Sequence, residues 1–208
     1  TVNVLDTDTT APVITSGTTG TDLAENLGAG SAVYTITASD AVGVVSYAIG
    51  GADASLLILE MQQIANSYVG VVRLAANPDY ETKSSYSFNV TATNVGGPSP
   101  ARTVTFSISN VDEVSPTITS GTTGIDLAEN SGAAQTVHTI SATANDGGTI
   151  QSYVIAGPDA ALLSLNTLTG VVTLNVDPDY ETKNSYSFTV TASDAAGTSL
   201  PTEVTFQI

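Results

Sequence analysis

The chain has 208 residues, no Cys and no Trp, and its 20 Asp and Glu against 4 Lys and Arg give a net charge of −16. This charge excludes nucleic acids and anionic lipid surfaces as partners, because both would repel it. The lack of Cys excludes disulfides and thiolate metal sites, and the lack of any run of 18 apolar residues excludes membrane insertion by a helix.

The N-terminal segment "TVNVLDTDTTAP" begins without Met and without a signal peptide. Residues 1–10 resemble the end of the segment that links the two repeats described next. We therefore expect them to be the tail of a preceding repeat, and the chain to be an excerpt of a longer protein.

Two copies of one unit follow. "PVITSGTTGTDLAEN" (12–26) matches "PTITSGTTGIDLAEN" (116–130), and residues 70–93 match residues 170–193. The first copy carries extra residues around 60–69. This repetition predicts two domains of about 100 residues, 11–113 and 114–208.

Within each copy apolar residues alternate with polar ones. In "YSFNVTATN" Tyr86, Phe88 and Val90 share one face, and "TVTFSI" repeats the pattern. About seven such runs per copy, separated by Gly, Asn, Asp and Pro, predict an all-β fold built as a small antiparallel β-sandwich.

The hexapeptide "PDYETK" occurs at 78–83 and again at 178–183. If it is extended, Asp79 and Glu81 point the same way and Tyr80 points oppositely, anchoring the segment against its domain. Two carboxylates about 5 Å apart repel by roughly 3 kcal/mol at an effective dielectric near 20. The pair is therefore expected to be either solvated or neutralised by a cation.

Further acids lie in segments that would converge if two sandwiches were joined end to end. They precede the first full strand, occupy the link before Pro116, or follow strands of the second copy. Calcium takes six to eight oxygen ligands, which such a set can supply. The predicted junction ligands are Glu25, Asp79, Glu81, Asp112, Glu113, Asp146 and Asp194.

At this point the chain resembles the cadherin repeat, through "AEN", "DYE", "NVDEVSP", "ATAND" and "ASD" in the family's order. It is most similar to the cadherin-like repeats of large bacterial surface proteins. The resemblance implies two tandem seven-stranded Greek-key sandwiches, calcium at domain junctions, adhesion and an extracellular location.

The chain departs from the family pattern in several places. Ala144 replaces the first residue of the family's Asp-x-Asp, leaving Asp146, and Val114 replaces the last Asn of the link. We therefore expect the two inner sites of the junction to be better formed than the outer one. A weaker upstream set comprises Asp6, Asp8, Asp40 and Asn94, and a downstream half-site comprises Glu129, Asp179 and Glu181.

Enzymatic activity is not expected. Asp79 and Glu81 as a glycosidase pair would lie on one strand without an aromatic cleft. His138 stands where the first copy has Tyr34, which predicts a surface strand residue. Lys83 and Lys183 are expected to offset the neighbouring acids rather than to form isopeptide bonds.

These features predict a calcium-binding tandem module of an extracellular adhesin-type protein, with calcium stiffening the junction. Its expected partners are calcium, neighbouring repeats of the same chain, and a cell-surface polysaccharide or a further adhesin. The alternative is a carbohydrate-binding module, for which Tyr34 and Tyr68 are the candidate exposed aromatics. Self-association also stays open, although a strand swap anchored by Trp is excluded by the lack of Trp.

Overall fold

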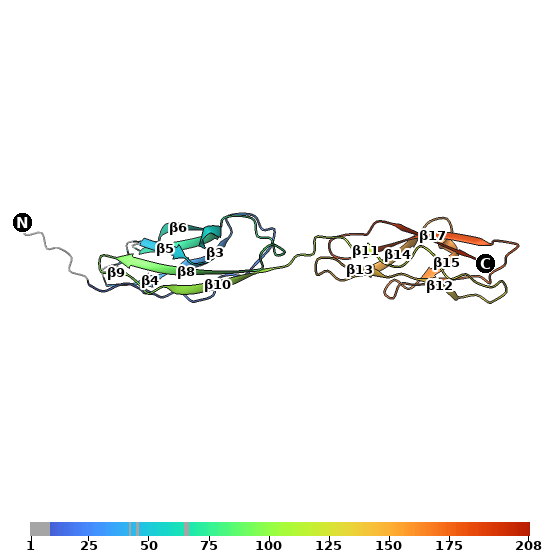
Figure 1. Ribbon diagram of the computed structural model, residues 1–208, viewed down its shortest axis with the longest axis horizontal. Coiled ribbons are helices and arrows are strands. Elements are labelled where there is room, and N and C mark those ends of the chain that lie inside the picture. Colours follow the sequence, from blue (N-terminus) through green and yellow to red (C-terminus); the bar gives the residue numbers. More distant parts are fainter. Residues whose placement is uncertain (1–8, 42, 45, 65–66) are drawn as a thin grey trace, which may run out of the picture. The chain divides into compact units, whose positions relative to one another are not determined.

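The computed structural model describes residues 9–41, 43–44, 46–64 and 67–208. The chain folds as two compact units, residues 1–110 (unit 1) and 111–208 (unit 2) (Figure 1). The domain boundary between residues 113 and 114 expected from the sequence stays a prediction.

Unit 1 is a β-sandwich. One sheet has the strand order β2-β10-β8-β5, with β9 paired to β8, and the other has the order β3-β7-β6. A short β1–β4 pair completes it, and β2 runs parallel to β10 while the other pairings are antiparallel. The strands are β1 (Val13–Ile14), β2 (Leu23–Ala24), β3 (Ala32–Ile36), β4 (Ala38–Ser39), β5 (Ser46–Gly50), β6 (Leu57–Ile64), β7 (Ser67–Leu74), β8 (Ser85–Asn94), β9 (Gly97–Pro98) and β10 (Arg102–Ser109), and Ala54–Leu56 form the 3₁₀ turn η1.

Unit 2 repeats this plan. Its sheets have the orders β14-β17-β18 and β12-β16-β15, and a β11–β13 pair corresponds to β1–β4. The strands are β11 (Thr117–Ile118), β12 (Gln135–Thr139), β13 (Ala142–Thr143), β14 (Ser152–Ala156), β15 (Leu163–Leu165), β16 (Val171–Leu174), β17 (Ser185–Ser193) and β18 (Thr202–Gln207), and Ala160–Leu162 form the 3₁₀ turn η2. No helix within the described ranges is long and apolar enough to span a bilayer.

The core of each unit comes from the alternating strands. In β8, Tyr86, Phe88, Val90 and Ala92 are buried, and the residues between them are less so. Tyr86 stacks on Phe106 with ring centroids 4.7 Å apart. The predicted all-β fold, with one sandwich per repeat, is confirmed.

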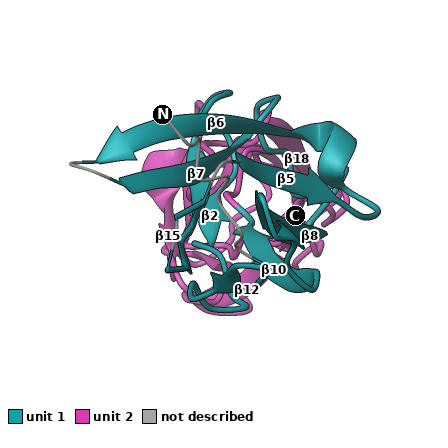
Figure 2. Cartoon of the chain, turned by 90° about the vertical axis from the view of Figure 1, so that its left-hand side faces the viewer, with its two compact units in different colours: residues 1–110 teal, residues 111–208 magenta. Residues whose placement is uncertain are grey.

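The residues peculiar to the first copy lengthen a hairpin. β6 and β7 have eight residues each, whereas their counterparts β15 and β16 have three and four. The hairpin extends past the rest of its sheet (Figure 2).

Candidate metal centre

Glu25 is a buried carboxylate at one end of unit 1. It directly follows β2, and only 3% of its surface is exposed. Its Oε2 accepts a hydrogen bond of 2.8 Å from the backbone N–H of Tyr80. The carboxylate is therefore held against the "PDYETK" segment.

The "PDYETK" segment is a turn and not a strand, so the prediction of an extended conformation was wrong. The backbone N–H of Lys83 donates to the carbonyl of Asp79 at 2.9 Å. The N–H and hydroxyl of Thr82 each donate to the Asp79 carboxylate at 2.9 Å, and these bonds lower the pKa of that carboxyl. Tyr80 is 38% exposed, so it does not anchor the segment as predicted.

The second copy has the same turn. The backbone N–H of Lys183 donates to the carbonyl of Asp179 at 2.9 Å, and the N–H and hydroxyl of Thr182 donate to the Asp179 carboxylate at 3.1 and 2.7 Å. Tyr180 is 51% exposed. Both copies of the hexapeptide therefore form the same turn, in which the acidic residues are exposed.

The lysine of the hexapeptide pairs with an acid that sequence reasoning missed. Lys83 Nζ lies 3.0 Å from Asp53 Oδ1 and 5.1 Å from the centroid of the Tyr86 ring. Asp53 also accepts a hydrogen bond of 2.7 Å from the N–H of Ser87. Lys183 makes the same pair with Asp159 at 3.1 Å. The lysines thus stabilise the sandwich, and the predicted charge compensation at the neighbouring acids was wrong.

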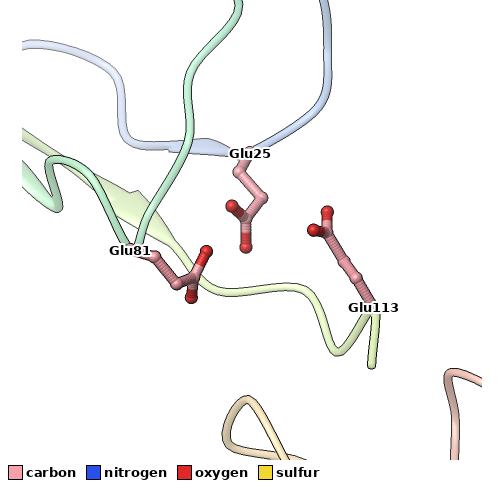
Figure 3. Close-up of side chains that lie close together, drawn as sticks. All are labelled: Glu25, Glu81 and Glu113. Atoms are coloured by element: carbon pink, nitrogen blue, oxygen red, sulfur yellow. The ribbon is translucent and has the colours of Figure 1, made fainter. Parts of the chain in front are cut away.

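Three glutamate side chains have carboxylate oxygens close to one another. Glu25, Glu81 and Glu113 each have an oxygen within 4.8 Å of the others (Figure 3). Two ligands on opposite sides of one calcium ion are about 5 Å apart, since each Ca–O distance is 2.3–2.6 Å. The spacing fits a shared hard cation, and the Nδ2 of Asn110 additionally donates to Glu81 at 3.4 Å.

Unit 2 contains anionic oxygens without a protein partner. Both carboxylate oxygens of Asp112 and the Oδ2 of Asp194 are buried and have no hydrogen bond. The Oδ1 of Asp194 accepts bonds of 3.1 Å from the backbone N–H groups of Ala196 and Gly197. A buried carboxylate oxygen without a partner is costly, so these three oxygens fit cation ligands.

The loop after β13 lies against Asp112. A Cβ added to Gly148 would lie 2.2 Å from Asp112 Oδ2, so only glycine leaves space for that carboxylate. Asp146 accepts a hydrogen bond of 3.3 Å from the N–H of Glu113. Asn145 Nδ2 donates to the carbonyl of Ser115 at 3.0 Å, which ties the loop to the link.

The upstream set is built differently. Asp6 and Asp8 lie outside the described residues, and Asp40 directly follows β4. Asn94, which corresponds to Asp194, is buried and donates through Nδ2 to the carbonyl of Thr10 at 2.9 Å. The Nδ2 of Asn94 therefore has a hydrogen-bond partner in the protein, whereas the Oδ2 of Asp194 has none.

The downstream half-site has the same backbone hydrogen bond as the corresponding loops of unit 1. Asn130 donates its N–H to the carbonyl of Pro178 at 2.8 Å, as Asn26 does to Pro78 at 3.0 Å. Glu129 is exposed, whereas Glu25 is buried. Asp179 and Glu181 lie in the exposed turn described above.

Two predicted surface residues are buried, so those predictions were wrong. Tyr34 is 8% exposed and donates its hydroxyl to the carbonyl of Gly17. His138 is 6% exposed, packs edge-on against Phe188, and has a pKa lowered chiefly by burial. The carbohydrate-binding alternative thereby loses Tyr34, while Tyr68 is 47% exposed as predicted.

Comparison with known proteins points to one family. The model of the Cadherin domain matches residues 124–208. The chain is 32% identical over its whole length to mouse Protocadherin Fat 4, of which it spans 4%, and 30% identical to rat Protocadherin-16, of which it spans 6%. The chain is thus a small part of the length of these relatives.

Solved structures show the same fold. The Protocadherin GammaB4 extracellular domain has a TM-score of 0.74 at 19% identity, covering 95% of this chain and 32% of that one. Human Protocadherin-24 EC1-2 has a TM-score of 0.70 at 18% identity, covering 96% of this chain and 98% of that one.

These findings show a tandem β-sandwich fold like that of the solved protocadherin structures, with a match to the cadherin domain model over residues 124–208. The relatives named come from mouse and rat, so the expected likeness to bacterial surface proteins is not confirmed.

Proposed function

We propose that this cadherin-like chain is a calcium-binding tandem module of an extracellular adhesion protein, in which calcium stiffens the connection between successive domains. The observation that carries the proposal is the set of buried, unpartnered carboxylate oxygens on Asp112 and Asp194. Calcium prefers oxygen ligands and commonly binds several carboxylates, so these oxygens suit calcium.

The ligands divide by origin. Glu25, Asp79 and Glu81 come from loops of unit 1, and Glu113 comes from the start of unit 2. Although Thr82 occupies one direction of each Asp79 oxygen, a carboxylate oxygen can accept more than one interaction. Unit 2 supplies Asp112, Asp146 and Asp194. When bound, calcium supplies the positive charge that this set lacks.

Stiffening follows from where the ligands lie in the sequence. They come from loops before the link, from the link itself, and from loops after it. Without a cation their like charges repel, and the link is free to swivel. With a cation, the same oxygens are drawn to common points, which orders the link.

The affinity expected for such a site suits an extracellular setting. Calcium sites of extracellular modules have dissociation constants of about 10⁻⁴–10⁻³ M, well above cytosolic calcium. The target of adhesion and a bacterial parent protein remain part of the proposal, and no contact of the described residues favours a polysaccharide as the target.

Isothermal titration of calcium into the chelator-stripped chain tests binding. We expect saturable binding that Asp112→Asn and Glu113→Gln each weaken about tenfold or more, while Glu60→Gln, which alters an exposed acid in β6 paired with Arg73, leaves binding unchanged. Equal binding by all variants would contradict the assigned ligands.

X-ray scattering with calcium and with EDTA tests stiffening. We expect a narrower distribution of interatomic distances in calcium and a change in the radius of gyration. If wild-type chain that binds calcium scatters identically in both conditions, calcium binds but does not stiffen.

A further inference from the structure

Unit 1 has a long exposed sheet edge that unit 2 lacks. β6 is the last strand in the order β3-β7-β6, and within the described residues it pairs only with β7. It has eight residues, whereas β15, at the same place in unit 2, has three. Short edge strands are one way in which proteins prevent sheets from pairing edge to edge, and unit 1 does not use it.

The side chains of β6 suit contact with another protein surface. Ile58, Met61 and Ile64 are 45%, 42% and 57% exposed. Met61 pairs across the hairpin with Gly70, which has no side chain to cover it. Exposed apolar side chains therefore run along the whole strand.

Charge favours a second copy as the partner. The only charged residue of β6 is Glu60, and Arg73 Nε lies 2.9 Å from its Oε2. A chain with a net charge of −16 repels its own copies over most of its surface, so a neutral segment is where two copies can approach.

The hydrogen-bond phase of the hairpin decides which backbone groups face outward. The N–H of Ala75 donates to the carbonyl of Leu56 at 2.9 Å, beside the Leu57–Leu74 pair. Bonds alternate along an antiparallel pair, so Leu57, Leu59 and Met61 direct their N–H and C=O away from β7. These groups form a template for one more strand.

We propose that β6 pairs antiparallel with β6 of a second copy, centred on Met61. In this register Met61 lies opposite itself, Ile58 opposite Ile64, and Glu60 opposite Gln62. A register centred on Glu60 would place two glutamates directly opposite, which is destabilising. The pairing thus joins the two sheets into one, and it brings two Ile58–Ile64 pairs together on one face and the two Met61 side chains together on the other.

Cysteine crosslinking tests the register, because the chain has no native Cys. In a hydrogen-bonded antiparallel pair, opposite Cα atoms are about 5.5 Å apart, within the range of a disulfide. Met61→Cys is expected to form a covalent dimer at least about tenfold faster than Glu60→Cys, which is displaced by two positions from its copy. Ser164→Cys, in the middle of β15, is the matched control in unit 2 and is expected to stay monomeric.

Sedimentation velocity over a range of concentrations tests the association itself. We expect wild type to form dimers, and Met61→Lys to weaken them about tenfold or more, because it places two like charges opposite each other. Ser164→Lys should leave the dimer unchanged. Circular dichroism checks that each variant folds.

Both experiments are run in calcium and in EDTA, so that failure of the calcium proposal leaves this one testable. A wild-type chain that stays monomeric at every concentration would overturn the proposal. So would equal crosslinking of the three cysteine variants, or open-ended oligomers in place of dimers.

Discussion

Replacing Asp194 with asparagine is expected to stabilise unit 2 in EDTA and to reduce the stability that calcium adds. The Oδ1 of Asp194 accepts two backbone N–H groups, and its Oδ2 is buried without a partner. Asparagine keeps the first oxygen and replaces the second with an N–H donor. Asn94 of unit 1 shows how such a donor is used, since it bonds the carbonyl of Thr10 at 2.9 Å.

The magnitude follows from the cost of a buried polar atom without a hydrogen bond, about 1–3 kcal/mol. In EDTA the variant should raise the free energy of unfolding of unit 2 by about that amount when its new N–H donor bonds a carbonyl as that of Asn94 does. For a domain of this size, each kcal/mol raises Tm by about 4–8 °C. In calcium at about a hundred times Kd, wild type gains about 2.7 kcal/mol, and a tenfold weaker site gains only about 1.4 kcal/mol.

Differential scanning calorimetry in EDTA and in about 10 mM calcium measures both effects. Asn94→Asp is the reciprocal control, because it removes the donor to the Thr10 carbonyl and should destabilise unit 1 in EDTA. An Asp194→Asn variant that is less stable than wild type in EDTA, or that gains as much from calcium, would refute the reasoning.

Three further variants test the other features of the site and the core. Gly148→Ala should weaken calcium binding about tenfold without unfolding the domain, because the added Cβ displaces the Asp112 carboxylate. Gly121→Ala, whose added Cβ has no neighbour closer than 4.0 Å, should bind calcium as wild type does in the same titration. Lys83→Met should lower the free energy of unfolding, measured in urea, by about 1–2 kcal/mol, since it removes an ion pair to the largely buried Asp53 and a contact with the Tyr86 ring. Arg73→Met removes a more exposed ion pair and should lower it by less than about 1 kcal/mol. Equal losses in the two variants would contradict this ranking. Burial lowers the pKa of His138 in the folded chain below its value in the unfolded chain, so unit 2 should lose stability as pH falls below about 6.5, by at most about 1.4 kcal/mol per pH unit. His138→Tyr should remove this part of the pH dependence in thermal melts between about pH 7 and pH 5.5. An unchanged pH dependence would show that the imidazole is not its source.

The sequence predicted the sandwich because period-two alternation reports burial directly. Tyr86, Phe88 and Val90 of β8 are buried as expected. The pattern failed at Tyr34, where the register of β3 against β7 shifts between Ala32 and Tyr34. An irregularity of this kind lets two successive residues face inward, and β12 has the same shift before His138.

The ligands named from the sequence stay a prediction, and the sequence rule missed the local geometry of the "PDYETK" segment. The rule that residues i and i+2 share a face holds only in strands, and Asp79 instead caps a turn through Thr82. An Asp followed three residues later by Thr is a signal for such a turn. The pairing of Lys83 with Asp53 joins residues thirty positions apart, and only the matching Asp159 and Lys183 of the second copy hinted at it.

A crystal structure of the chain grown in millimolar calcium, with anomalous scattering data, tests the central claim most directly. The account predicts calcium ions bound 2.3–2.6 Å, approximately, from carboxylate oxygens of Asp112 and Asp194, and a further ion among Glu25, Glu81 and Glu113. Water in hydrogen-bonding contact with those oxygens, without an anomalous peak, would contradict it.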